Sequence, residues 1–423
     1  MIGFYGGACN NLYVIAKAMH DYGMQLVFVE DRDQGFPHGQ PVWDDVDLYF
    51  SSGFESASVG WDAFEEENGW RPPVWYFKPE KQLLSYREVF RNSTAPLLIR
   101  FFACRYLRAR EEVFSVFNEL SKCDFLIVCG VRASILAMLT GRPYMIIPHG
   151  SDMRLAIGAE HKPGVKGWLV EFLAAYSFRK ANFIGSSLPD GSAEVERGSY
   201  RRFKSLEVQR VPIPYKQCMR LSDTERRAKL NELFISLGRN LPSAKYYCFT
   251  PSRINFHWKG HDRLLRAIEK NKDAPDIHFI FLGWGDDYLE AVEYVERQCL
   301  TNVVTILPLF LSKKYLMRFF TSVDFIIDSL NGNGGYGTSL SEAMSVGCPV
   351  VTWISNMFDQ PGWERPPVIQ ARTEDELDLV IKDISNGKID LASQSRTAAD
   401  WFARVHASER VFEVLQEKIY GRR

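Results

Sequence analysis

The sequence predicts an α/β protein made of two Rossmann-like, doubly wound domains that face a central cleft. Its 423 residues suit two domains of about 200 residues each. Short apolar runs alternate with segments of helical spacing along both halves of the chain. No repeat of solenoid period and no low-complexity segment interrupts this alternation. Alternation of this kind is typical of parallel sheets covered by helices on both faces.

In the first half, five apolar runs followed by turn residues are predicted to be strands. They are MIGFY, QLVFVE, FLIVCG, YMIIPHG and ANFIGSS. Helical spacing is found between them, for example over residues 11–22 and 111–122. Residues 31–96 are irregular and hold six of the prolines, so this stretch is too long to be a plain connection.

The second half repeats the pattern. Its predicted strands are YYCFTPSR, IHFIFLG, NVVTILP, VDFIIDS and CPVVTW. The charged residues 223–229 predict a helix near the linker between the halves. We therefore expect an N-terminal domain over residues 1–215 and a C-terminal domain over residues 216–400. A C-terminal helix over residues 401–423 is expected to pack back on the N-terminal domain.

Composition and charge argue against several classes of protein. Apolar residues make up 46% and charged residues 24%, which excludes a disordered chain. A formal net charge of -1 argues against nucleic acid as the main partner. The eight cysteines are scattered without a CxxC pair, which favours free thiols in a reducing compartment. No apolar run reaches the ~18 residues that span a bilayer, and MIGFYGG lacks the features of a signal peptide. We expect a cytoplasmic protein.

The stretch VDFIIDSLNGNGGYGTSLSEAMSVGCPVVTW, residues 323–353, is the most informative part of the chain. An apolar run predicts a strand, four glycines predict a loop, and a helix of small residues is expected to start near Ser339. This order brings helix-start N–H groups to a phosphate at the carboxyl edge of a parallel sheet. The backbone N–H groups of Gly335, Tyr336 and Gly337 are the candidate ligands of that phosphate.

Glu342 has two possible roles. Ser339 and Glu342 have the spacing of a capping box, in which the carboxylate only satisfies an N–H group at the helix start. Alternatively, its two oxygens accept both hydroxyls of a ribose. One side chain cannot fully serve both roles, so the two interpretations compete.

The strand that ends at Phe249 leads into PSRINFHWKGHDRLLRAI. Arg253 and Lys259 flank a short loop before a helix expected over His261–Glu269. Two cations at the carboxyl end of a strand suit the charge that develops on a leaving diphosphate. The alternative is a solvated loop with two ordinary surface cations.

Two loops of the N-terminal half also hold candidates. Gly6 and Gly7 follow the first strand and permit close approach of the backbone to a ligand. His149 and Asp152 follow the strand YMII and suit acid–base or hydrogen-bonding roles. A capped turn with His149 satisfied by backbone groups is an equal alternative.

Two Asp-x-Asp pairs, at Asp31/Asp33 and Asp45/Asp47, could in principle hold a divalent cation with a diphosphate. They lie away from the glycine loop, so solvated carboxylates are the simpler interpretation. We expect no metal site.

These motifs resemble the C-terminal domain of retaining glycosyltransferases of family 4, which have the GT-B fold. The resemblance rests on the order and spacing of PSRINFHWKGHDRLLRAI, FLGWGDD and GGYGTSLSEAMSVGCPVV, over roughly residues 245–352. In the N-terminal half it rests on the general pattern and the Pro-His-Gly loop alone.

The resemblance implies a role for each matching residue. Arg253 and Lys259 would bind the donor diphosphate, and His149 would line the donor sugar; these are the catalytic candidates. Glu342 would bind the ribose, and the loop at Leu309 and Phe310 would lie beside the base. The remaining donor-binding candidates are Gly7, Asp152, Asn333, Gly335, Tyr336 and Gly337.

One position departs from the family. Gly334 stands eight residues before Glu342, where the family has a glutamate that contacts the donor sugar. The pocket therefore lacks one charge and one acceptor. Asn333 or Asn331 would substitute in part, or the donor sugar would differ from the common hexoses.

The implied activity is that of a hexosyltransferase-like enzyme of polysaccharide biosynthesis. It would transfer a sugar from a UDP- or GDP-linked donor, with retention, without a metal and without a further cofactor. The acceptor would be a glycan, a lipid-linked molecule or a protein. Two alternatives are a nucleotide-sugar epimerase of the same fold and an inactive GT-B binding protein. An epimerase needs acid–base carboxylates, for which the candidates are Asp152 and Glu342.

Basic residues alternate with aromatic residues in IRFFACRYLRAR, residues 99–110, and in YSFRK, residues 176–180. One interpretation is a peripheral contact with anionic lipids on the inner face of the membrane. The other is a helix that packs its apolar side chains into the core and leaves its arginines in solvent.

Overall fold

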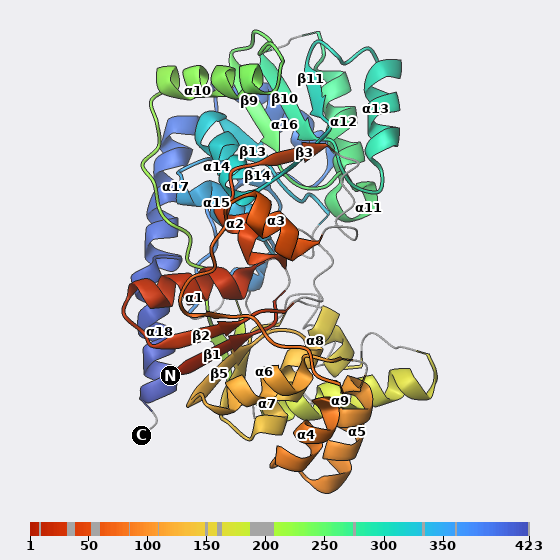
Figure 1. Cartoon of the computed structure of the whole chain (residues 1–423). Coiled ribbons are helices and arrows are strands. Elements are labelled where there is room, and N and C mark those ends of the chain that lie inside the picture. Colours follow the sequence, from red (N-terminus) through yellow and green to blue (C-terminus); the bar gives the residue numbers. More distant parts are fainter. Residues whose placement is uncertain are drawn as a thin grey trace. The chain divides into compact units, whose positions relative to one another are not determined.

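The computed structural model describes residues 1–7, 10–31, 39–51, 60–83, 85–108, 110–148, 151–158, 163–186, 207–273, 276–331, 335–359 and 362–421. The chain forms two compact units, each built on a parallel sheet with helices on its faces (Figure 1). The predicted α/β class with two Rossmann-like domains is therefore confirmed.

The chain passes between the two units four times. Unit 1 comprises Met1–Trp43, Ser56–Pro214 and Ser408–Arg423, and unit 2 comprises Asp44–Glu55 and Tyr215–Ala407. Residues 44–55 thus belong to the second unit, whereas the sequence analysis assigns them to the N-terminal domain. The end of the chain belongs to the first unit.

Unit 1 contains a seven-stranded sheet of order β4-β2-β1-β5-β6-β7-β8 in which all neighbours are parallel. Its strands are β1 (Ile2–Tyr5), β2 (Leu26–Val29), β4 (Tyr76–Phe77), β5 (Phe125–Val128), β6 (Tyr144–Ile146), β7 (Phe183–Ser186) and β8 (Glu207–Arg210). The strand order reverses between β1 and β5. The carboxyl ends of these two strands are therefore the topological switch point, where open α/β sheets bind ligands.

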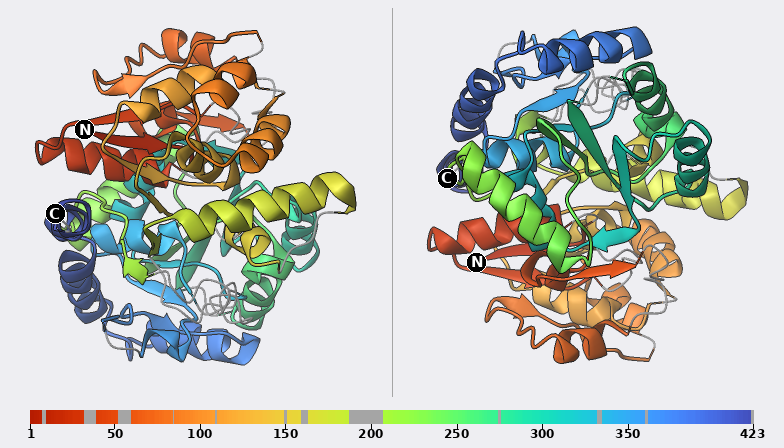
Figure 2. Two further views of the ribbon diagram at one scale, coloured as in Figure 1. Left: turned by 90° about the horizontal axis from the view of Figure 1, so that it is seen from below. Right: turned by 90° about the horizontal axis from the view of Figure 1, so that it is seen from above.

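Helices cover both faces of this sheet. α1 and α18 lie side by side on one face, over Phe4, Phe28 and Ile127 (Figures 1 and 2). The opposite face, with Val29 and Val128, packs against α4 to α9. Because both faces are buried, the central strands are continuous apolar runs. The helices are α1 (Asn11–Asp21), α3 (Trp61–Glu67), α4 (Ser85–Asn92), α5 (Leu97–Leu107), α6 (Val113–Ser121), α7 (Val131–Thr140), α8 (Ser151–Ala156), α9 (Gly164–Lys180) and α18 (Ser408–Tyr420), with α2 (Pro41–Asp45) at the passage into unit 2.

Unit 2 contains a six-stranded parallel sheet of order β11-β10-β9-β13-β14-β15. Its strands are β9 (Tyr246–Thr250), β10 (Ile277–Leu282), β11 (Val304–Leu307), β13 (Phe325–Ile327), β14 (Val350–Thr352) and β15 (Ile369–Gln370). Here the order reverses between β9 and β13. The loops that follow these two strands therefore meet at the switch point of unit 2.

The sheet of unit 2 is also covered on both faces. Phe279, Phe281 and Ile327 pack with α12 and α16 on one face. On the other face the ring of Phe249 stacks on Phe319 of α14, with ring centroids 4.8 Å apart. The helices are α10 (Asp223–Ser236), α11 (Phe256–Lys259), α12 (His261–Lys270), α13 (Tyr288–Arg297), α14 (Lys313–Ser322), α15 (Thr338–Ser345), η4 (Asn356–Phe358), α16 (Glu374–Ser385) and α17 (Leu391–Val405).

A small antiparallel sheet joins β3 (Tyr49–Ser51) to β12 (Leu309–Leu311) within unit 2. The backbone N–H of Leu48 also donates to Oγ of Ser312 at 3.0 Å. Asp47, one of the Asp-x-Asp carboxylates, is ion-paired with Arg318. Leu309 and Phe310, which the sequence analysis assigns to a loop, thus lie in a strand because residues 49–51 supply its partner.

Candidate functional site

The loop that carries Arg253 is held tightly against its neighbour. After β9 the chain turns at Ile254, whose N–H donates to the carbonyl oxygen of Trp284 at 2.7 Å. Gly285 has φ +116°, and a Cβ there would lie 2.4 Å from the carbonyl oxygen of Ile254. Only glycine allows this approach of the two loops. The side chain of Asn255 then caps α11 by accepting from the N–H of Trp258 at 2.6 Å.

Arg253 and Lys259 extend from this fixed loop. Arg253 is exposed and Lys259 is half-buried. Neither side chain has a carboxylate partner among the residues that the structure describes. Both therefore keep their charge available at the carboxyl end of β9, beside the switch point. An anionic ligand would find two uncompensated cations there.

His261, which was not among the predicted site residues, holds this loop through a hydrogen bond to its backbone. Its ring is buried in the first turn of α12, where Nδ1 accepts from the N–H of Asn255 at 3.2 Å. Burial lowers the pKa of His261 to about 4. The ring is therefore neutral at physiological pH, as its acceptor role requires.

The glycine loop ends at an uncapped helix. Gly337 is the N-cap residue of α15, and because it has no side chain it supplies no side-chain cap to this helix. These groups and the helix dipole favour an anion. Gly335, Tyr336 and Gly337 lie directly before α15, as predicted, whereas Asn333 and Gly334 lie outside the described residues.

Tyr336 anchors this loop through its ring. The ring stacks on Phe358 with centroids 5.5 Å apart, and Oη lies 3.3 Å from Nε2 of His406. Trp401 meets the same ring edge-on at 5.9 Å. The side chain is thus packed in an aromatic cluster, and the predicted role falls to the backbone N–H of Tyr336.

Glu342 does not form the capping box that its spacing allows. It is the fifth residue of α15, two positions further along the helix than a capping box at Ser339 requires, and the helix has no side-chain cap. Its side chain is 1% exposed and its Oε1 accepts from Nζ of Lys313. Glu342 is therefore a buried, charge-paired carboxylate, and the capping interpretation is wrong.

Lys313 was missed by the sequence analysis. It is the first residue of α14, and its Nζ lies 5.7 Å from the ring centroid of Tyr215. The ion pair between Lys313 and Glu342 joins α14 to α15, and its two residues are 29 positions apart in the sequence. No local pattern signals such a contact.

Asp328 is a second buried carboxylate that the sequence analysis did not single out. It follows β13, and its N–H donates to the carbonyl oxygen of Val351 at 3.1 Å. Oδ1 is buried and has no hydrogen-bond partner among the described residues. Oδ2 lies 3.9 Å from where a Cβ on Gly337 would be. The carboxylate of Asp328 thus lies beside Gly337, the residue at which α15 begins.

Phe310 lies close to the loop that carries Arg253. Its ring meets the ring of Trp284 edge-on, with centroids 4.8 Å apart. Trp284 in turn accepts from Ile254, next to Arg253. Phe310 is thus linked to the cationic loop through one aromatic contact, while Leu309 pairs with Ser51 in the small sheet.

In unit 1 the predicted site residues lie in two places, directly after β1 and after β6. A Cβ on Gly6 would lie 2.1 Å from the carbonyl oxygen of Cys129, so the turn after β1 needs glycine; Gly7 follows with φ +149°. Asp152 is buried, and its carboxylate accepts from the N–H of Gly130 at 3.1 Å and of Met153 at 2.8 Å. His149 lies outside the described residues.

In the described part of the chain, no group of three or more His, Cys, Asp or Glu side chains is placed to hold a metal ion. Among the described helices, none combines the length and the apolar character that a membrane span requires. Asp31, from the other Asp-x-Asp pair, is ion-paired with Arg132.

Residues 238–359 match the family model of glycosyl transferases group 1. This segment contains Arg253, Lys259, Asp328 and Glu342, and it runs from just after α10 to just after η4. No curated protein sequence matches the chain at a significant level.

Solved structures resemble the chain over nearly its full length. The Anabaena protein HepE, crystallised with UDP and glucose, has a TM-score of 0.58 at 15% identity and covers 99% of both chains. Sucrose-phosphate synthase from Thermosynechococcus elongatus has a TM-score of 0.62 at 12% identity, over 100% of this chain and 98% of its own. The lipopolysaccharide outer core galactosyltransferase WaaB has a TM-score of 0.52 at 12% identity, over 100% and 99%.

At these identities the likeness establishes the fold alone. The chain has the two-domain GT-B fold, and its residues 238–359 match the family model of glycosyl transferases group 1.

Proposed function

We propose that the protein transfers a sugar from a nucleoside diphosphate sugar to an acceptor hydroxyl. One observation carries the proposal: Arg253 and Lys259 have no carboxylate partner in the described part of the chain and follow β9 at the switch point of unit 2. The uncapped start of α15 follows β13 at the same sheet edge. Together these groups suit the two negative charges of a leaving diphosphate.

The proposed reaction proceeds with retention. The bond between the anomeric carbon and the diphosphate oxygen breaks, and the acceptor oxygen bonds to the same face of that carbon. The acceptor proton passes to the released diphosphate, so no side-chain nucleophile is needed. Arg253, Lys259 and the N–H groups of α15 stabilise the leaving group, and we propose that no metal takes part.

Glu342 is proposed to accept a ribose hydroxyl. Lys313 holds Oε1, so Oε2 is the acceptor that remains for the ligand. Lys313 would then act as a positioning residue that offsets the charge of the buried Glu342. Asp328, with its unpartnered Oδ1, is proposed to accept from hydroxyls of the donor sugar, where Gly334 supplies no side chain.

We propose UDP as the nucleotide part of the donor, and it is the first nucleotide to test. HepE was crystallised with UDP and with UDP-glucose, which supports a UDP-linked donor for a chain of the same fold. GDP and GDP-sugars serve as the competing set.

The test is calorimetric titration of UDP, GDP and their sugars into the full chain and its variants. Arg253→Ala and Lys259→Ala are each expected to weaken UDP binding by about tenfold or more, because each removes a charge-assisted contact. Arg239→Ala, which removes an exposed arginine elsewhere in unit 2, should leave the affinity unchanged. Unaltered UDP affinity in both site variants would refute the phosphate assignment.

Asp328→Asn separates the sugar side from the nucleotide side. We expect weaker binding of the UDP-sugar with little change for UDP alone. Product analysis by NMR decides between retention and inversion at the anomeric carbon, and activity in the presence of a chelator decides the role of metal. Appearance of an epimer from the donor alone, without acceptor, would favour the epimerase.

A further inference from the structure

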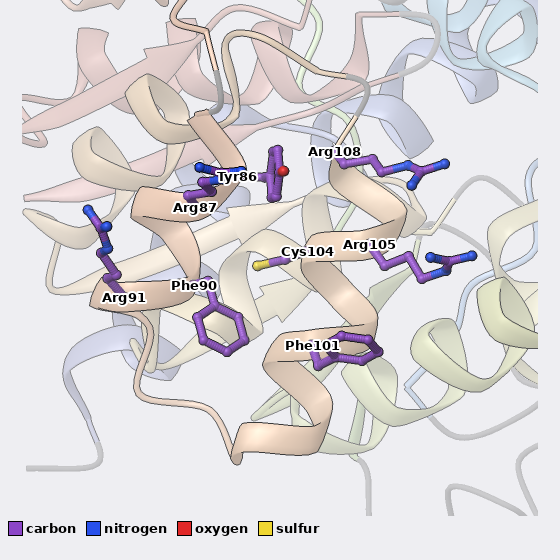
Figure 3. Close-up of a pocket in the computed structure, with 8 residues that line it drawn as sticks. All are labelled: Tyr86, Arg87, Phe90, Arg91, Phe101, Cys104, Arg105 and Arg108. Carbon is purple, nitrogen blue, oxygen red and sulfur yellow. The ribbon is translucent and has the colours of Figure 1, made fainter.

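A cavity of about 350 Å³ lies between α4 and α5 of unit 1 (Figure 3). Its volume falls within the roughly 300–1,000 Å³ of small-molecule sites. The side chains of Phe90 and Cys104 point between the two helices, and Tyr86 and Phe101 complete an apolar lining. Arg100 fixes one wall, because its guanidinium lies 5.7 Å from the ring centroid of Phe90 and donates to the carbonyl oxygen of Phe90 at 3.3 Å.

Four arginines surround this apolar lining: Arg87, Arg91, Arg105 and Arg108. Arg91 is paired with Glu88 at 2.7 Å. The other three are exposed and have no carboxylate partner in the described ranges. Residues 85–108 contain five arginines and one glutamate, although the whole chain has a formal net charge of -1. Positive charge is thus concentrated around one cavity.

An exposed apolar ridge continues from the cavity. Leu97 and Leu98 of α5 are each 64% exposed, and Phe101 is 55% exposed. Aromatic rings then run from α5 to α9 in the order Phe101, Phe102, Phe172 and Trp168, with centroid separations of 5.7, 6.4 and 5.6 Å.

The ridge ends at Trp168, which is 57% exposed. Soluble surfaces rarely leave a contiguous apolar patch of this kind uncovered unless it binds something. Within residues 99–110 the expected core packing holds for Ile99, Ala103, Cys104 and Leu107, which are buried, whereas Phe101 is more than half exposed.

We propose that the cavity and ridge bind the surface of an anionic bilayer. The phosphate of an anionic lipid would be held by Arg87, Arg105 and Arg108, with part of its acyl chain in the cavity. Leu97, Leu98 and Trp168 would enter the boundary between headgroups and chains, where tryptophan is favoured. Charge complementarity selects this occupant, because an uncharged apolar partner would leave three arginines without counter-charge.

The site is independent of the proposed transfer reaction, because it contains none of the donor residues. The test is flotation of the full chain with vesicles of phosphatidylcholine alone or mixed with phosphatidylglycerol, at low and at high salt. Binding is expected with the anionic vesicles, and it should weaken at high salt. Since each basic residue near an anionic surface contributes about fivefold, Arg105→Ala combined with Arg108→Ala should weaken binding by about 25-fold.

The matched control combines Arg71→Ala with Arg239→Ala, which removes the same charge from exposed positions outside the cavity. The affinity of this control variant for anionic vesicles should be closer to that of the wild type than the affinity of the Arg105/Arg108 variant is. Leu97→Ser combined with Leu98→Ser tests the apolar contribution and should also reduce binding. UDP affinity and melting temperature should be unchanged in all of these exposed variants, which separates this proposal from the transfer reaction.

Two results would overturn the proposal. One is equal binding of wild type and the Arg105/Arg108 variant to anionic vesicles. The other is binding to a soluble polyanion such as heparin without any binding to vesicles, which would indicate a polyanion surface instead.

Discussion

Lys313 is the cation that offsets the burial of Glu342 in α15. Removing one partner of such a pair leaves the other charge without compensation, which costs more than the pair itself contributes. The two partners differ in this respect. Glu342 is almost fully buried, whereas the side chain of Lys313 is partly exposed and can reach water.

Lys313→Met is therefore expected to destabilise the protein by about 3–5 kcal/mol, the usual cost of removing one partner from a buried ion pair. Glu342→Gln should cost less, since the lysine it leaves unpaired can be solvated. Chemical denaturation measures both changes. Lys314→Met, at the exposed neighbouring position, is the control and should have little effect; an equal loss in that variant would disprove a specific pair.

His261 gives unit 2 a predictable response to acid. Its pKa is lowered from 6.5 to about 4 by burial. As the pH falls below 6.5 the unfolded chain binds a proton at this ring and the folded chain does not. The free energy of unfolding therefore falls by about 3 kcal/mol between pH 6.5 and pH 4 on account of this residue.

His261→Asn should remove the share of that dependence that this ring contributes, because an amide oxygen can accept from the N–H of Asn255 without titrating. His278, whose pKa burial also lowers to about 4, should keep its own share. Denaturation midpoints across this pH range provide the measurement. His257→Asn removes an exposed histidine four residues earlier and should retain the wild-type slope. A slope that His261→Asn leaves unchanged would show that this ring is not the source.

At the scale of elements, the position of the glycine loop depends on the aromatic cluster around Tyr336. The ring of Tyr336 packs with Phe358 and Trp401, which come from η4 and α17. The backbone N–H groups before α15 are therefore placed by a side chain that points away from the proposed ligand.

Tyr336→Ala is expected to weaken UDP binding by loosening this loop, and to lower the melting temperature through the lost packing. Tyr336→Phe retains the ring and removes the hydroxyl that lies 3.3 Å from Nε2 of His406, so its stability should change by about 1 kcal/mol or less. Titration calorimetry with UDP and thermal melting distinguish the two variants. Full UDP affinity in Tyr336→Ala would mean that the loop holds its position without the ring.

The central strands were predictable because both faces of each sheet are buried. β1, β2, β5, β6 and β7 of unit 1, and β9, β10, β11, β13 and β14 of unit 2, all fall within the predicted apolar runs. β4 and β15 have two residues each, too few to form a periodic pattern. β3 and β12 were missed because their pairing joins segments more than 250 residues apart.

The same limit applies to the site. Arg253 and the residues before α15 follow strands that the sequence reveals, so their common edge could be inferred. The partner of Glu342 and the buried Asp328 depend on tertiary contacts that no spacing encodes. The spacing of Ser339 and Glu342 is a local pattern that predicts a capping box. In the folded chain, Glu342 instead pairs with Lys313 through a tertiary contact.

At the scale of the whole molecule, α18 completes the core of unit 1. Val411 and Leu415 are fully buried in the cluster that also contains Phe4 and Tyr13. The ring of Phe412 stacks on Tyr22 of the turn after α1, with centroids 5.2 Å apart. The side chain of Tyr22 also bonds to Glu409, which raises the pKa of Tyr22 to about 12.

A chain that ends at Ala407 should therefore have a less stable unit 1. Burying a Val or Leu side chain contributes about 1.5–3 kcal/mol, and two such residues are lost. Thermal melting of the truncated and full chains provides the measurement. Gln416→Ala, an exposed change on the same helix, should melt like the wild type; an unaltered melting temperature after truncation would show that α18 contributes little.

The late position of α18 in the chain has a consequence for biosynthesis. A ribosome makes the seven strands of unit 1 first, but the helix that covers one face of them follows only after residues 215–407. During that interval α18 is missing from the sheet face on which α1 packs, so the apolar cluster that contains Phe4 is incomplete. The nascent chain is thus exposed to aggregation for as long as unit 2 takes to be translated, and chaperones that shield apolar surface would act in this interval.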